Sequence, residues 1–155
     1  MMRPIDLASV VLALFLAGGA GAETVRPGFF SVRLPVIAIL HDELFVGEAV
    51  GYLDRTGTIE VKSVLDSADK CVGTFRYTGP ETGVVQLRCD DGSEATLLFD
   101  GLGAFSGYGQ GNTRRGPASF TFGLGPGEAA SHLKVPRDKK LVEGAEGPRL
   151  EPVRP

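Results

Sequence analysis

The central part of the chain, residues 47–99, alternates apolar and polar side chains and carries a turn signal every few residues. Alternation with a period of two is typical of strands that bury one face, and short intervening turns favour antiparallel hairpins. We therefore predict an all-β domain built as an antiparallel meander of about five to seven strands. A sheet of this size must bury its apolar face, so we expect it to close into a small barrel or roll, with a sandwich as the alternative.

One predicted hairpin brings the two cysteines of the chain together. The segments "KCVGTFRYTG" and "TGVVQLRCDDG" flank a turn centred on Pro80. This register sets Phe75 opposite Val85 and Cys71 opposite Cys89, and the hydrophobic alternation fixes it independently of the cysteines. We predict a disulfide between Cys71 and Cys89, which would stabilise the fold by about 3 kcal/mol in the chain-entropy model.

The hairpins on either side have their own turn signals. In "DRTGT" we expect a three-residue loop with Gly57 in the left-handed region, which sets Leu53 opposite Ile59. In "DDG", residues 90–92, Gly92 takes the positive-φ position by the same logic. Both registers place apolar side chains opposite one another, so the alternation and the turn chemistry agree.

The flanking segments extend this domain in both directions. The stretch "FFSVRLPVIAILHDELFV" predicts one or two further strands broken by Pro35, with residues 36–40 buried on both faces. "ASFTFGL" predicts another strand, with Phe120 and Phe122 on one side, and "GPGEAASHL" predicts a short C-terminal helix. The single β-domain would span residues 23–135. From residue 136 the four prolines and mixed charge predict a disordered tail to residue 155.

The first 22 residues have the order of a secretory signal peptide. Arg3 precedes an apolar run over residues 7–16, and small residues end at Ala22, so we expect cleavage before Glu23. A retained N-terminal anchor is the competing interpretation, although the run is short for a membrane span. No cysteine follows the run, which argues against an acylated lipoprotein. We expect a periplasmic or secreted protein without a transmembrane segment after signal removal, in a compartment that favours the disulfide.

Composition limits the classes of partner and cofactor that we expect. The formal net charge is -3, without the basic excess that nucleic-acid binders concentrate on one face, so we expect no nucleic-acid partner. Two cysteines alone cannot make a structural zinc site. Nothing in the sequence indicates a cofactor.

The glycine-rich stretch "GLGAFSGYGQGNTRRGP", residues 101–117, is the most unusual in the chain. Its G-x-G-x-G spacing lacks the following helix of a dinucleotide fingerprint. We interpret it as a long crossing between two strands. Because aromatic and arginine side chains dominate binding hot spots, Tyr108, Arg114 and Arg115 are the candidate binding residues.

Candidate catalytic residues do not form a recognisable set. Ser106 in "FSGYG" has Ala104 where a nucleophile elbow needs glycine. The two histidines, His41 and His132, lie far apart in the sequence, and a serine-type triad needs one of them beside both a hydroxyl and a carboxylate. We predict no catalytic residues and favour a non-enzymatic role.

The candidate metal ligands of the sequence also fail to form a recognisable set. His41, Asp42 and Glu43 are consecutive, and adjacent side chains in an extended chain point in opposite directions. A polar turn after the preceding strand explains them better. Asp90 and Asp91 fit a hairpin turn. No metal site is predicted.

The blocks "GYLDRTGTIEV", "CVGTFRYTG", "LRCDDG", "SGYGQG" and "FTFGL" resemble those of uncharacterised small exported bacterial β-domain proteins of the secreted or lipoprotein-like kind. The resemblance covers residues 45–133. It implies an exported β-domain and brings neither an activity nor site residues. Such relatives often carry a lipid-attachment cysteine, which this chain lacks.

Our leading hypothesis is therefore a non-enzymatic envelope protein that binds a protein, a peptide or a cell-envelope component. Two alternatives remain open. One is a small envelope hydrolase, which requires titratable side chains that converge in a cleft. The other is a carrier of a small apolar ligand, which requires an interior cavity of at least about 300 Å³.

Overall fold

The structure is a computed structural model that describes residues 30–154. The predicted signal peptide and its cleavage point before Glu23 lie outside the described residues. Within residues 30–154, no helix has the length and apolar character needed to cross a membrane.

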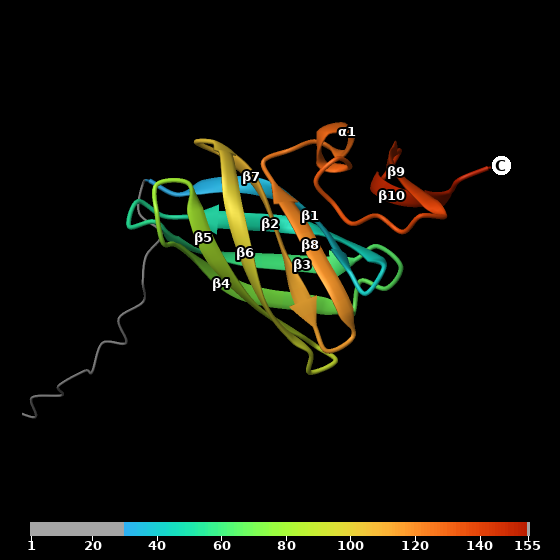
Figure 1. The fold of residues 1–155 in the computed structure, drawn as a ribbon, viewed down its shortest axis with the longest axis horizontal. Coiled ribbons are helices and arrows are strands. Elements are labelled where there is room, and N and C mark those ends of the chain that lie inside the picture. Colours follow the sequence, from blue (N-terminus) through green and yellow to red (C-terminus); the bar gives the residue numbers. More distant parts are fainter. Residues whose placement is uncertain (1–29, 155) are drawn as a thin grey trace, which may run out of the picture.

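Eight antiparallel strands form a closed barrel, in which each strand pairs with the next and the last pairs with the first (Figure 1). They are β1 (Val32–Leu40), β2 (Glu43–Gly51), β3 (Thr56–Ser63), β4 (Lys70–Tyr77), β5 (Thr82–Cys89), β6 (Glu94–Gly103), β7 (Ser106–Thr113) and β8 (Gly116–Phe122). The prediction of an all-β antiparallel meander closed into a barrel is confirmed. The strand count exceeds the predicted five to seven, because the glycine-rich stretch, predicted as a crossing, forms strand β7.

Strand β1 continues through Pro35, which the sequence had predicted to break it. The carbonyl of Pro35 accepts a hydrogen bond from the backbone nitrogen of Gly123 at 2.9 Å. In an extended strand, the nitrogen and the carbonyl of one residue point to the same side, so the nitrogen of Pro35 also points toward the end of β8. There Gly123, with a φ of +70°, leaves the extended conformation. The N–H donor that proline lacks would therefore lie where the pairing of β1 with β8 ends, and its absence does not interrupt the strand. Residues 36–40 are buried on both faces, as predicted.

The β4–β5 hairpin has the predicted register. Cys71 pairs with Cys89 and Phe75 pairs with Val85. The two cysteines form the predicted disulfide. The β5–β6 turn also follows the prediction, since Gly92 takes a φ of +82°. Hydrophobic alternation was sufficient here because both faces of the hairpin differ clearly in polarity.

The β2–β3 hairpin differs from the prediction by a shift of the turn toward the N-terminus. Ile59 pairs with Ala49, and Leu53 lies in the turn with 72% of its surface exposed. Arg55, with a φ of +66°, takes the left-handed conformation that was predicted for Gly57. Gly57 lies instead inside strand β3 and is buried.

The predicted long glycine-rich crossing is wrong, because residues 106–113 form strand β7. Gly107 and Gly109 face the barrel interior directly opposite Phe122 and Phe120 of β8. A Cβ on either glycine would overlap the ring of its partner. Glycine alone disfavours strands, but here each missing side chain makes room for an aromatic ring across the ladder.

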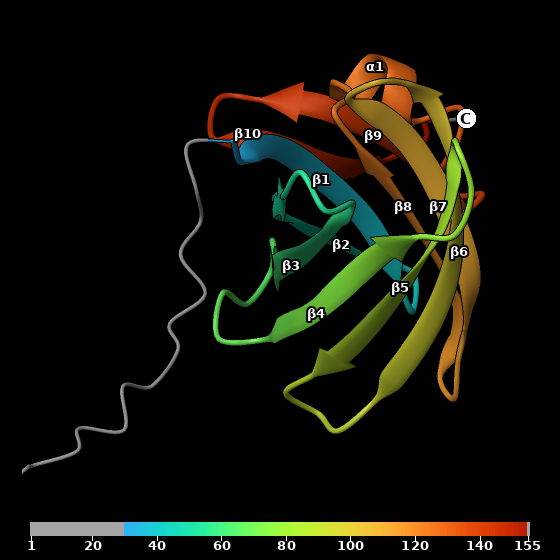
Figure 2. The same cartoon turned by 90° about the vertical axis from the view of Figure 1, so that its left-hand side faces the viewer.

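The C-terminal segment packs on the outside of the barrel. A short helix follows β8 as predicted, α1 (Pro126–Ala129), and two further strands, β9 (Lys139–Gly144) and β10 (Gly147–Pro152), form a hairpin. The prediction of a disordered tail from residue 136 is therefore wrong. Figure 2 shows α1, β9 and β10 beside the outer face of β1.

A second apolar cluster explains this packing. Its buried members are Ile37, Ile39, Leu44, Leu124, Ala129 and Leu133, and Leu141 and Leu150 of the hairpin pack against it. The outer face of β1 is apolar and needs a cover, which the hairpin supplies. Composition alone concealed this, because Leu141 and Leu150 stand among charged residues and prolines.

Candidate functional site

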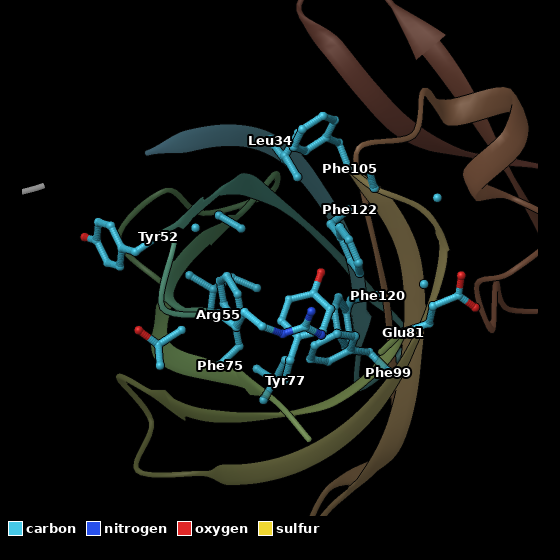
Figure 3. Close-up of a pocket in the computed structure, with 18 of the residues that line it drawn as sticks. Leu34, Tyr52, Arg55, Phe75, Tyr77, Glu81, Phe99, Phe105, Phe120 and Phe122 are labelled. Carbon is cyan, nitrogen blue, oxygen red and sulfur yellow. The ribbon is translucent and has the colours of Figure 1, made fainter. Parts of the chain in front are cut away.

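A cavity of about 430 Å³ opens at one end of the barrel. We call this the open end; it carries the β2–β3, β4–β5 and β6–β7 turns, to which Arg55, Pro80 and Ala104 belong. Apolar and aromatic side chains dominate the wall: Leu34, Ile59, Phe75, Tyr77, Val85, Phe99, Phe120 and Phe122. Figure 3 shows the rings of Phe99, Phe120 and Phe122 along one side of this space.

The barrel is hollow at the open end because several strands present glycine to its interior there. Gly51, Gly57, Gly83 and Gly107 occupy the inward positions at the open ends of β2, β3, β5 and β7. Phenylalanine rings lie across three of them: Phe75 over Gly57, Phe99 over Gly83 and Phe122 over Gly107. The rings are thereby held against the wall. The other half of the interior is filled by buried side chains, among them Leu40, Phe45, Val61 and Leu97.

Edge-to-face contacts fix the aromatic wall. The ring of Phe99 lies 5.1 Å from that of Tyr77 and 5.7 Å from that of Phe122, at interplanar angles of 90° and 85°. Phe75 contacts Phe99 in the same way at 6.3 Å. Aromatic pairs prefer this geometry because the positive edge of one ring meets the negative face of the other. The wall is therefore pre-formed.

Arg55 lies over the entrance of the cavity. Its guanidinium carbon is 4.5 Å from the centroid of the Tyr77 ring, a cation–π arrangement. Its Nη2 donates hydrogen bonds to the carbonyl oxygens of Gly79 at 2.6 Å and Pro80 at 3.0 Å. The backbone nitrogen of Tyr77 in turn donates to the Arg55 carbonyl at 2.9 Å. These contacts join the β2–β3 turn to the β4–β5 turn and hold the cation at the open end (Figure 3).

Within residues 30–154, neither neighbouring carboxylate, that of Asp54 or that of Glu81, forms an ion pair with this cation. Asp54 accepts hydrogen bonds from the backbone nitrogen and hydroxyl of Thr56, at 3.0 and 2.6 Å, and these bonds lower the pKa of the Asp54 carboxyl. Glu81 also borders the cavity, but its carboxylate points away from it in Figure 3. None of the ion pairs among residues 30–154 includes Arg55.

The predicted binding residues do not form one patch. Tyr108 lies on the outer face of β7, where its ring stacks on that of His132 with centroids 4.5 Å apart. Arg114 and Arg115 form the β7–β8 turn at the opposite end of that strand. Arg115 pairs with Asp91 at 2.5 Å. Tyr108 thus helps to hold the C-terminal segment, and the two arginines lie away from the cavity.

The candidate triad residues also lie apart. Ser106 begins β7 at the open end, whereas the ring of His41 contacts the Thr113 hydroxyl at the other end of the same strand, 3.0 Å away. His132 is stacked on Tyr108. The hydrogen bonds found within residues 30–154 join Ser106 to neither histidine.

Two acidic residues near the end opposite the cavity, Asp42 and Asp91, lie in turns. His41 and Asp42, with φ of 55° and 65°, form the polar turn predicted after β1. Asp91 accepts hydrogen bonds from Ser93, and these bonds, with the one from Arg115, lower its pKa to about 2. Burial and the nearby Glu43 raise the pKa of Asp69. In the described part of the chain, no three histidine, cysteine, aspartate or glutamate side chains converge to hold a metal ion.

The sequence did contain a signal for the cavity that the prediction missed. Three glycine–phenylalanine pairs, Gly57 with Phe75, Gly83 with Phe99 and Gly107 with Phe122, lie directly opposite one another in neighbouring strands. Once the hairpin registers are known, these pairs mark one end of the interior as rich in glycine and aromatic rings.

Comparisons of the chain with protein-family profiles, with curated proteins and with solved structures found no match. The site is therefore described by its own geometry: a pre-formed aromatic cavity of about 430 Å³ with an arginine at its entrance that is in no ion pair of residues 30–154.

Proposed function

We propose that this protein binds a small, largely apolar molecule in the open end of its barrel. The cavity carries the proposal. Its volume of about 430 Å³ exceeds the roughly 300 Å³ that a ligand carrier requires and lies within the range of small-molecule sites. Eight-stranded barrels are just wide enough either to be filled by their own side chains or to hold one small ligand. The inward glycines at the open end favour the second case.

The geometry gives less support to the hypothesis of a protein, peptide or envelope component bound through Tyr108, Arg114 and Arg115. That hypothesis assumed that the three residues share one long crossing between two strands. Tyr108 is instead stacked on His132 and Arg115 is paired with Asp91, at the two ends of a regular strand. We therefore place the ligand in the cavity.

We also propose that the protein acts outside the cytoplasm, as a periplasmic or secreted protein. The disulfide between Cys71 and Cys89 supports this, because structural disulfides persist in oxidising compartments. Fractionation of the source cells with detection of the oxidised protein tests it, and recovery of the reduced protein from the cytoplasm alone would contradict it.

A cavity-filling variant tests the binding proposal. Gly51 lines the cavity, and a Cβ there would meet only the Phe75 ring, at an ordinary 3.6 Å. We expect Gly51→Leu to fold and to occupy the binding space. Gly127→Leu is the matched control, because nothing lies within 4 Å of a Cβ at that position in α1.

The measurement is an NMR titration with dodecanol, a neutral apolar probe. We expect amide shifts of the open end to move in the wild-type protein and in Gly127→Leu, and to stay in place in folded Gly51→Leu. The proposal is wrong if the wild-type spectrum does not respond, or if Gly51→Leu binds the probe as the wild type does.

A further inference from the structure

We infer that the ligand is amphipathic: an apolar body that enters the cavity, with a single carboxylate that pairs with Arg55. The inference rests on the proposed function and specifies the chemical class of its ligand. Its basis is the position of one positive charge over a largely apolar cavity, whose one acidic lining residue among residues 30–154, Glu81, points away from it.

Arg55 has hydrogen-bonding capacity left for a ligand. A guanidinium carries five N–H donors, and within residues 30–154 its hydrogen bonds use only Nη2, toward the carbonyls of Gly79 and Pro80. Both acceptors are neutral, and none of the ion pairs within residues 30–154 includes Arg55. Nε and Nη1 remain to bind a carboxylate.

The side chain is also held in place before any ligand arrives. The left-handed backbone of Arg55, with φ of +66°, aims it from the β2–β3 turn toward Tyr77, whose ring it covers at 4.5 Å. The two carbonyls hold one edge of the guanidinium. Because little side-chain freedom remains to be lost, an anion at this position is bound at low entropic cost.

Among residues 30–154, no carboxylate forms an ion pair with Arg55 at this place. Asp54 is engaged by Thr56, and Glu81 points away from the cavity. Beyond Arg55 and Glu81, those of residues 30–154 that line the cavity are uncharged. A ligand that fits must therefore be apolar along its body and can carry charge only at the end that remains at the entrance.

A carboxylate suits this arrangement better than a phosphate monoester. A planar guanidinium matches the two oxygens of a carboxylate in parallel hydrogen bonds. A phosphate monoester carries close to two negative charges at neutral pH, and Arg55 is the only cation that lines the cavity within the described residues. The charge balance favours a monoanion.

Calorimetric titrations with four probes that share one alkyl chain test the inference: dodecanoate, dodecanol, dodecylamine and dodecyl phosphate, each below its aggregation concentration. We expect the wild-type protein to bind dodecanoate at least about tenfold more tightly than dodecanol, as one charge-assisted hydrogen-bonded pair allows. Dodecylamine should bind more weakly than dodecanol, and added salt should weaken the binding of the two anionic probes without weakening that of dodecanol.

Three variants locate the charge. Arg55→Gln should lower the dodecanoate affinity to near that of dodecanol, and Arg55→Lys should fall between, because an ammonium lacks the planar pair of donors. Arg76→Gln is the matched control: Arg76 faces outward from β4, exposed, opposite Thr56, so removing its charge should leave the preference intact.

The outcomes separate the two proposals. Equal binding of dodecanoate and dodecanol by the wild type overturns the anion inference and leaves the cavity proposal standing. Tighter binding of dodecyl phosphate than of dodecanoate overturns the carboxylate assignment. A preference that survives Arg55→Gln overturns the role of Arg55. Failure of every probe to bind rejects the proposed function, and the inference with it.

Discussion

Gly109 lies directly opposite Phe120 in the β7–β8 ladder, and the phenylalanine ring occupies the place where a side chain on residue 109 would be. Because of this pairing, residues 106–113 form a strand, although their glycine content alone would predict a loop. It also means that these two positions cannot vary independently.

Gly109→Ala should destabilise the barrel by about 1–3 kcal/mol, the usual cost of overpacking a core. The new Cβ would lie 2.5 Å from the carbonyl oxygen of Leu98 as well as against Phe120, and the backbone cannot yield as a side chain can. Urea unfolding measures the change. Gly127→Ala, in open space, should be neutral or slightly stabilising; equal effects of the two substitutions would contradict the argument.

Removal of the disulfide should cost about 3 kcal/mol, because the bond closes a loop with a sequence separation of 18. The comparison is between the oxidised wild type and the double variant Cys71→Ala/Cys89→Ala in urea. Mass measurement of the wild type should show the loss of two hydrogens. Free thiols in the folded protein would be incompatible with the observed pairing.

Acid should weaken the fold through Asp91. Hydrogen bonds from Ser93 and Arg115 lower the pKa of Asp91 from its ordinary 3.8 to about 2, so the folded state favours the carboxylate. This contribution to stability is present above about pH 4 and is lost as the pH falls toward 2. Asp91→Asn should therefore be less stable than the wild type at neutral pH.

The stability difference between wild type and Asp91→Asn should shrink between pH 4 and pH 2, as followed by thermal unfolding across that range. Asp100→Asn is a suitable control, because Asp100 is exposed on β6 and is in none of the ion pairs of residues 30–154. A difference that stays constant with pH would show that Asp91 acts only through packing.

The C-terminal hairpin should contribute measurably to stability. Leu150 is half-buried against the second apolar cluster, so Leu150→Ala should cost roughly 1–2 kcal/mol, less than a fully buried leucine. Val153 is 50% exposed at the end of the hairpin, and Val153→Ala should have little effect. Similar unfolding midpoints for wild type and Leu150→Ala would mean that the hairpin does not stabilise the barrel.

Much of the barrel could be predicted from hydrophobic alternation. The pairing of Cys71 with Cys89 followed from it, whereas turn chemistry predicted Gly92 in its turn and a continuous apolar run predicted the burial of residues 36–40 on both faces. These features depend on local pattern, in which neighbouring residues carry the information.

The features that were predicted wrongly depend on contacts with residues in other strands of the chain. Strand β7 is stabilised by the rings of β8, and the turn before β3 moved because Gly57 is needed opposite Phe75. The hairpin of β9 and β10 forms against β1, from the other end of the described chain. The cavity and the position of Arg55 require all these registers at once, which explains why sequence reasoning placed the binding residues elsewhere.

The double burial of β1 has a consequence for the order of folding. All other barrel pairings join consecutive strands, whereas the pairing of β1 with β8 joins the first strand of the barrel to the last. Contacts of such long sequence separation are slow to form. Until they do, Ile37 and Ile39 lack the cover that the C-terminal hairpin provides. The first strand of the barrel is therefore the last to be shielded from water. A chain that lacks its C-terminal segment would expose the apolar outer face of β1, and exposed apolar surface of this kind promotes aggregation.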